Sequence, residues 1–312
     1  MTSKLKVGVA GVGHIGREHA RVYSRLDTAE FVGVYDIDAD ISQRLAQQHN
    51  VRRFASLAEM AAEVDALTIA TPTNTHYQIA TQFLQAGRHV LIEKPITDNV
   101  GEARELVALA NEKNAVLQVG HIERFNPALQ ALEEKLTRPK FIEAHRLSPY
   151  PGRSTDIGVV LDLMIHDLEV ILHLVKSKIT SVDAVGVAVL SKGEDIANAR
   201  IRFANGCVAN LTTSRISPEK MRKIRVFQDD AYLSLDYQNQ AGEIYRKVGP
   251  QITRDKIEVQ KDEPLKLELT SFVECAMARR TPVVSGAQAA AALDVAMQIT
   301  DQIWSQPPAE KL

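Results

Sequence analysis

Apolar residues in the first part of the chain form short runs that alternate with segments of helical periodicity. The helical segments include 16–25 and 100–113, together with one that ends near Ala86 and is closed by Gly87. Because strand–helix–strand repetition joins parallel strands, residues 1–122 are predicted to form a parallel sheet with helices on both faces. The predicted strands are Lys6–Ala10, Phe31–Tyr35, Ala66–Ala70, His89–Ile92 and Val116–Gly120.

The pattern changes to a period of two from about Phe141. Residues 184–189 alternate between small and bulky side chains, and residues 198–203 alternate between polar and mostly apolar ones. Asn205-Gly206 is a strong signal for a tight hairpin, and Asp229-Asp230 is predicted to join a second one. Residues 123–312 therefore read as an α+β domain with a largely antiparallel sheet and two closing helices, at about 265–279 and 287–303.

One predicted helix, over residues 157–175, combines an apolar surface with a polar stripe. The apolar surface predicts burial. Asp162, His166, Glu169 and His173 nevertheless follow a spacing that places them on a single face. Buried polar groups need partners, so the stripe either faces solvent or lines a cleft, and the pattern alone favours neither.

The first predicted strand runs directly into a glycine loop, Gly11-Val12-Gly13-His14-Ile15-Gly16, and a helix. Glycines at these positions allow a tight turn, close approach of a pyrophosphate to the backbone, and close helix–strand packing. Asp36 ends the second strand, where an acidic residue would bind the adenosine ribose hydroxyls of a dinucleotide. The alternative is that Asp36 caps a turn in an unrelated α/β domain. The loop and the spacing together predict a Rossmann domain.

Two further polar segments fall at the carboxyl ends of predicted strands, where ligands of parallel sheets bind. They are Thr71–His76 and Glu93-Lys94-Pro95. A lysine in a loop is usually solvated, but its place on the cofactor side favours a functional role for Lys94.

Basic residues gather between Arg215 and Arg225, with Glu219 as the only acidic residue among them. Such a run is often a solvated face. The alternative is that some of these cations, with Arg146 and Arg153, bind an anionic substrate.

The composition narrows the function classes. A formal net charge of −2 gives no field that would hold nucleic acid or an anionic membrane surface. Two cysteines without ligand spacing fit a reducing cytoplasm and imply no metal site. The apolar run at the N-terminus is too short for a signal peptide.

Taken in order, GVGHIG, ATPTNTH, EKP and DLMIH resemble the Gfo/Idh/MocA family of oxidoreductases over essentially the whole chain. The resemblance implies NAD as cofactor, with Lys94, Asp162 and His166 as the catalytic group and the nicotinamide near Thr71–His76. It also implies dimers or tetramers formed through the antiparallel sheet, whose small face at 184, 186 and 188 would suit close contact. The implied cofactor-binding residues are Gly11, Gly13, His14, Ile15, Gly16, Asp36, Thr71, Pro72, Asn74, His76, Glu93 and Lys94.

Three stretches, GHIERFNPA, VVLDLMIHD and EDIANARIRFANGCVANLTTSRIS, are similar to the UDP-N-acetylglucosamine 3-dehydrogenase branch of the family. This implies a UDP-sugar substrate and a product that is aminated for lipid A synthesis. The candidate substrate-binding residues are Arg124, Arg146, Arg153 and Arg215. Many relatives have a basic pair where this chain reads Glu123-Arg124, so binding roles there cannot be transferred.

Three other functions stay open at this point. One is a dehydrogenase of a free polyol or sugar, or of another nucleotide sugar. The second is an NAD-binding sensor without turnover, which would be expected to lack Lys94 or His166, and both are present. The third is a structural protein in which the glycine loop binds no ligand.

Overall fold

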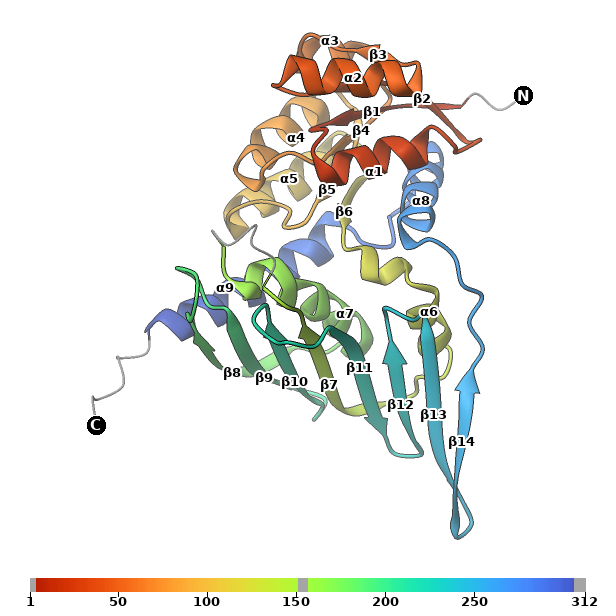
Figure 1. The fold of residues 1–312 in the computed structure, drawn as a ribbon, viewed down its shortest axis with the longest axis vertical. Coiled ribbons are helices and arrows are strands. Elements are labelled where there is room, and N and C mark those ends of the chain that lie inside the picture. The colour runs from red at the N-terminus through yellow and green to blue at the C-terminus, as the bar shows by residue number, and fades with distance from the viewer. Residues whose placement is uncertain (1–3, 151–156, 306–312) are drawn as a thin grey trace. The chain divides into compact units, whose positions relative to one another are not determined.

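The computed structural model describes residues 4–150 and 157–305 (Figure 1). The described residues up to Phe125, together with Glu263–Ala291, form one compact unit, here the first unit. Asn126–Asp262 and the described residues from Ala292 onward form the second unit. The sequence predicts one boundary after residue 122, so the structure differs in returning a later segment of the chain to the first unit.

The first unit contains a six-stranded sheet in the order β3-β2-β1-β4-β5-β6, with all strands parallel. β4 is buried along its whole length and β5 along all but its last residue, as expected for strands covered on both faces. The parallel α/β prediction is therefore confirmed. The strands are β1 (Leu5–Ala10), β2 (Ala29–Tyr35), β3 (Arg52–Arg53), β4 (Ala66–Ile69), β5 (His89–Glu93) and β6 (Leu117–Gly120).

Three helices of the first unit, α2, α3 and α5, begin at side chains that accept hydrogen bonds from the first helical N–H groups. Asp38 accepts from Asp40 and Ile41, Ser56 from Glu59, and Asn99 from Glu102. The helices are α1 (His14–Tyr23), α2 (Ala39–His49), α3 (Leu57–Glu63), α4 (His76–Gln85) and α5 (Val100–Glu112), with short 3₁₀ turns η1 (Thr73–Thr75) and η2 (Ile122–Phe125).

The helix α8 (Pro264–Ala278) is the returning segment. Leu269, Phe272, Val273 and Ala276 are buried in the same core cluster as the residues of β1 and α1. Their spacing of three and four residues forms one apolar stripe. A stripe of this kind predicts that a helix packs, but it does not specify which domain it packs on.

The second unit contains an eight-stranded sheet in the order β14-β13-β12-β11-β7-β10-β9-β8. Neighbouring strands are antiparallel except β7 and β10, which are parallel. Both predicted hairpins are confirmed, because β9 pairs with β10 across Asn205-Gly206 and β11 with β12 across Asp229-Asp230. The strands are β7 (Pro139–Leu147), β8 (Ile179–Val187), β9 (Ile196–Phe203), β10 (Val208–Ser214), β11 (Met221–Gln228), β12 (Ala231–Asp236), β13 (Ala241–Val248) and β14 (Gln251–Ile257).

One face of this sheet is covered by helices of its own chain, including α6 (Pro127–Glu133) and the later part of α9 (Gly286–Ser305). A methyl group on Gly186 would lie 2.9 Å from Ile303 of α9, so the small face of β8 packs against that helix. Val185 and Val187 instead lie on the open face, each 52% exposed. The chain's own helix therefore occupies the small face at Gly186, which leaves no room there for the expected oligomer contact. Within the described residues, no helix is long and apolar enough to cross a membrane.

The predicted helix over 157–175 is not a uniform α-helix. Val160–Met164 (η3) is a π-helical turn, in which the Ile165 N–H donates to the Val160 carbonyl, and it continues as α7 (Ile165–Val175). A π turn holds more residues per turn than an α-helix, which changes the residues that share a face. Such turns are frequent at functional sites.

Candidate active site

The glycine loop has the geometry of a phosphate cradle. Gly11 has a φ of +82°, and a methyl group on Gly16 would lie only 1.8 Å from the Gly11 carbonyl oxygen, so both positions require glycine. A methyl group on Gly13 would meet nothing within 4 Å, which leaves the backbone there open to a ligand. Helix α1 starts at this point without a side-chain cap or an acidic residue in its first turn. Its free N–H groups and dipole suit the pyrophosphate of NAD.

Asp36 lies at the end of β2 beside this loop. One carboxylate oxygen accepts a hydrogen bond from the Val12 N–H at 2.7 Å, and the other accepts from Asp38 N–H at 2.9 Å. Each carboxylate oxygen can accept further hydrogen bonds. The carboxylate is thus oriented against the loop in a way that fits the ribose hydroxyls of NAD.

The Thr71–His76 segment follows β4, but His76 does not point toward a ligand. Its side chain is 1% exposed, and its ring nitrogens lie 2.9 Å from the Thr71 and Pro95 carbonyl oxygens. This ring joins the two strand-end loops. His76 is accordingly no longer a candidate for direct contact with the cofactor.

Lys94 follows β5 and is half-buried. The preceding Glu93 lies 2.9 Å from Nε2 of the buried His19 in α1. A methyl group on Gly120 of β6 would approach the Glu93 carboxylate to 2.8 Å, so this glycine makes room for the acid. Glu93 is therefore fixed from two sides, which supports the expectation that it positions Lys94.

Two buried titratable residues, one near Lys94 and one near Glu93, are not singled out by the sequence. His121 directly follows β6, and its pKa is lowered to about 3 by burial and by the positive charges of Lys94 and Arg124. Glu268 of α8 is fully buried, and its pKa is raised well above the usual value by burial and by Glu93. His121 could have been found from its place at a strand end. Glu268 could not, because α8 was assigned to the other domain.

Because the His121 ring is neutral in the folded protein, we expect it to lower the free energy of unfolding as the pH falls. The folded pKa of about 3 is below the ordinary value of about 6.5, so between these values the unfolded chain binds a proton that the native protein excludes. Stability contributed by the neutral ring is present above pH ~6.5 and is lost as the pH falls toward ~3. His121→Gln removes this term.

The test is urea unfolding of both proteins at pH 7 and pH 5. Between these pH values the free energy of unfolding should fall by about 2 kcal/mol more in the wild type than in His121→Gln. The difference arises because the unfolded wild type binds one proton that the folded protein does not. His145→Gln, at a half-buried position in β7, should retain the wild-type loss. Equal losses for wild type and His121→Gln would contradict this assignment.

In the second unit, Asp162 lies in the π turn and His166 in the first turn of α7, and both are half-buried. Glu169 is only 2% exposed, so a continuous solvent-facing stripe is wrong. His173, further along the helix, lies 3.1 Å from Glu133 of α6. The polar residues of the helix thus face different surroundings.

The structure places the candidate substrate-binding arginines in different surroundings. Arg146 is 3% exposed and contacts Asp167 through two nitrogens, at 2.8 and 3.0 Å. Arg215 is 1% exposed and is bonded to Asp195 and to backbone carbonyls. Both are buried in the interior of the second unit. They are therefore structural residues, and the prediction that they bind substrate is wrong. Arg124 is buried in the first unit, and Arg153 lies outside the described residues.

Of the remaining basic residues of 215–225, Lys220 lies in an exposed loop and the others lie in a strand. Residues 221–225 lie in β11, where Arg225 pairs with Glu143 and Lys223 lies 3.9 Å from Asp236. The neighbouring strands β7 and β12 supply these partners. Lys223 and Arg225 of the basic run therefore serve cross-strand pairing. Among the residues that the structure describes, no three His, Cys, Asp or Glu side chains gather in a way that could hold a metal ion.

The fold and the glycine loop define an NAD-binding oxidoreductase. The chain belongs to the Gfo/Idh/MocA family: residues 5–121 match the oxidoreductase family model with an NAD-binding Rossmann fold, and residues 132–234 match the GFO/IDH/MocA C-terminal domain.

Among relatives, the chain is similar over both units to UDP-N-acetylglucosamine 3-dehydrogenase of Acidithiobacillus ferrooxidans. The identity is 38%, over 95% of this chain and 96% of the relative. A crystal structure of that enzyme superposes with a TM-score of 0.92, covering 97% of this chain and 98% of the other. The scyllo-inositol 2-dehydrogenase (NAD(+)) of Bacillus subtilis is 23% identical over 99% of this chain and 97% of its own. Levoglucosan dehydrogenase, at 16% identity, shares the fold with a TM-score of 0.87 over 96% of this chain and 97% of its own.

Proposed function

We propose that this protein oxidises the 3-hydroxyl of UDP-N-acetylglucosamine to a ketone with NAD. The observation that carries the proposal is the similarity to the Acidithiobacillus enzyme across both units, at 38% identity. The ketone would be the substrate of an aminating enzyme in lipid A synthesis.

In the proposed reaction, His166 takes the hydroxyl proton, and Asp162 orients the imidazole from the preceding turn. Lys94 stabilises the negative charge that develops on the oxygen as the proton leaves. NAD, when bound, supplies the acceptor for the hydride of the carbinol carbon.

The test is a panel of UDP-sugars, free sugars and inositols with NAD, followed by the absorbance of the reduced cofactor. UDP-N-acetylglucosamine should exceed free N-acetylglucosamine in kcat/KM by at least about tenfold. Each charge-assisted hydrogen bond to the diphosphate is worth about 1.5–3 kcal/mol, and the free sugar lacks them all. Comparable or better rates on a free sugar or an inositol would replace the proposal by a polyol or sugar dehydrogenase.

We expect a preference for NAD over NADP because Asp36 would repel a 2′-phosphate. Residues 37–41 contain no lysine or arginine to neutralise such a group. A repulsion of about 1–4 kcal/mol corresponds to a preference of about fivefold to several hundredfold. Asp36→Ser should narrow the ratio of the two kcat/KM values, whereas Asp40→Ser, in the first turn of α2, should leave it unchanged. Equal use of both cofactors by the wild type would contradict this role for Asp36.

We also infer that copies of this chain associate through the open face of the eight-stranded sheet. An aromatic row crosses four adjacent strands there, with ring centroids 5.6, 4.7 and 5.0 Å apart from Phe141 through Phe227 and Tyr232 to Tyr245. The four rings are half-buried in the described chain, and a continuous aromatic row on an otherwise open sheet face suits association with a second copy.

The expected state in light scattering is a dimer or tetramer, and Tyr232→Glu should shift it toward monomer by placing a charge in the row. Tyr150→Glu, an exposed tyrosine outside the sheet, should keep the wild-type mass. A monomeric wild type would overturn the inference.

A further inference from the structure

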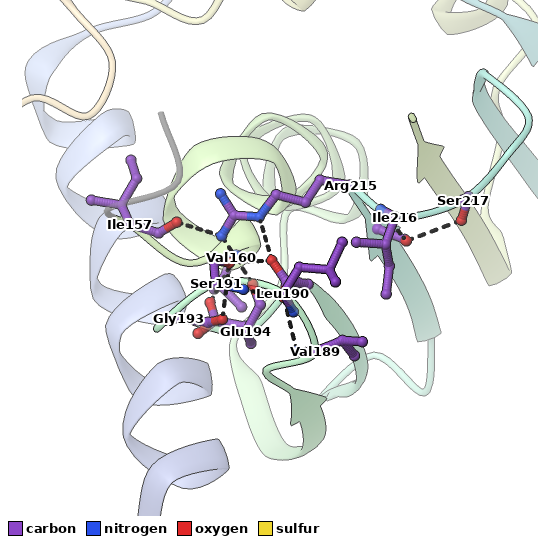
Figure 2. A network of polar contacts seen from close by, with 12 residues as sticks. Ile157, Val160, Val189, Leu190, Ser191, Gly193, Glu194, Arg215, Ile216 and Ser217 are labelled. Carbon is purple, nitrogen blue, oxygen red and sulfur yellow. Dashed lines mark hydrogen bonds and ion pairs between the residues drawn. The ribbon is translucent and has the colours of Figure 1, made fainter. Parts of the chain in front are cut away.

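A buried polar network holds the start of the helix that carries Asp162 and His166 (Figure 2). Val159 donates its N–H to the Glu194 carbonyl at 2.9 Å, and Val160 donates to the Glu194 carboxylate at 3.1 Å. The other carboxylate oxygen accepts from the Trp304 indole at 3.2 Å. Glu194 therefore caps this helix with both its backbone and its side chain.

Arg215, which directly follows β10, completes the network. Its guanidinium donates to Asp195 at 3.0 Å, to the Ile157 carbonyl at 2.5 Å and to the Glu194 carbonyl at 3.2 Å. One buried cation thus binds both Ile157, two residues before the first helical residue, and the loop that caps the helix. A planar fork of donors can hold several acceptors in fixed directions, which an ammonium group cannot.

The capping loop is itself rigid. Asp195 accepts the N–H groups of Val189, Leu190 and Ser191 at 2.6–2.9 Å, as well as the Ser191 hydroxyl. Although burial would raise the pKa of Asp195, these hydrogen bonds hold it below its usual range, so the partner of Arg215 stays charged.

Two glycines let the loop and the helix start approach each other. A methyl group on Gly158 would lie 1.9 Å from the Glu194 carboxylate, and one on Gly193 would lie 2.9 Å from Gly158. Neither position can carry a side chain without displacing the cap. The close contact between the capping loop and the helix start therefore requires glycine on both sides.

His166 is held by different contacts. It lies in α7, whose buried Ile165, Leu168 and Asp167 pack into the second unit, with Asp167 bound by Arg146 of β7. Asp162, in contrast, lies in the π turn between the capped start and α7. A change at the cap would move Asp162 more than it moves His166.

We propose that Arg215 and Glu194 are positioning residues for the reaction: they fix the helix start so that Asp162 is oriented toward His166. They act through Asp162 and touch neither substrate nor cofactor. The inference rests on the proposed function for its catalytic meaning, but the geometry it describes can be measured without substrate.

The experiment is an NMR titration of the His166 ring in the full chain, assigned by the loss of its signal in His166→Asn. Arg215→Lys keeps the charge and removes the fork, so any change in the titration reports geometry. A displaced Asp162 would favour the protonated ring less, and the midpoint should fall by several tenths of a pH unit or more. Of the other charged groups on this helix, Asp167 keeps Arg146 and His173 keeps Glu133, and the buried Glu169 is the same in every variant.

The decisive comparison repeats Arg215→Lys in a protein that already carries Asp162→Asn. If Arg215 acts through Asp162, Asp162→Asn lowers the midpoint by at least as much, and adding Arg215→Lys produces no further fall. In kinetics, Arg215→Lys should lower kcat about tenfold or more while the Kd for NAD stays unchanged. The control is Arg254→Lys, the same change in the exposed ion pair that Arg254 of β14 forms with Glu243 of β13. It should alter neither kcat nor the Kd for NAD.

Glu194→Gln is a second variant in case Arg215→Lys does not fold, and it should shift the midpoint in the same direction. An unchanged midpoint in the folded variants would overturn the proposal, as would a full shift that persists in Asp162→Asn. If the wild type oxidises no UDP-sugar but the titration behaves as expected, the proposed function fails and the positioning role stands.

Discussion

Replacing His166 by asparagine is expected to lower turnover about 10²- to 10⁴-fold, the usual contribution of a general base. Asparagine retains a polar side chain but cannot accept the hydroxyl proton at neutral pH. In the wild type the rate of alcohol oxidation should rise with pH through a single ionisation, because only the neutral ring is a base. That ionisation should be absent from the profile of His166→Asn.

The matched control is His173→Asn, two turns further along α7, where the ring contacts Glu133. It should keep the wild-type pH profile. The Kd for NAD should be near wild type in both variants, since the adenosine end is assigned to the glycine loop and Asp36 in the first unit. Normal turnover with an unchanged profile in His166→Asn would remove this residue from the proposed catalytic group.

Lys94→Ala is expected to lower turnover by about 10²- to 10³-fold, an effect similar in size to that of His166→Asn. Removing one group that stabilises a developing oxyanion typically has an effect of this size. The double variant with His166→Asn should be less than additive, because groups that act as one unit do not contribute independently.

The measurement is kcat for the two single variants and the double variant at saturating substrate. Lys113→Ala, which removes an exposed lysine next to the end of α5, is the matched control and should retain wild-type kcat. Fully additive losses would mean that Lys94 and His166 do not act on the same step.

Features determined by local chemistry could be predicted from the sequence. The glycine loop follows from steric limits, since Gly11 has positive φ and Gly16 admits no side chain. The hairpin at Asn205-Gly206 follows from turn conformation, and the parallel order of the first unit follows from strand–helix repetition. The order of four motifs along the chain also predicted the family that the comparisons show.

Features determined by distant segments of the chain could not be predicted. Apolar spacing in α8 gave no sign that it packs on β1 and α1, so the burial of Glu268 beside Glu93 was missed. Charge alone did not distinguish an arginine that binds substrate from one that binds a buried aspartate, as Arg146 and Arg215 do.

For the same reason, the alternation in β8 identified two faces but not which one the chain itself covers. Ile303 of α9, more than a hundred residues later, packs on Gly186 and leaves Val185 and Val187 on the open face. The sequence by itself determined backbone conformation and the types of side chain at the strand ends, because these depend on neighbouring residues. Only the tertiary structure decided which polar groups are paired and which surfaces are covered, because a partner's distance along the chain does not limit its distance in space.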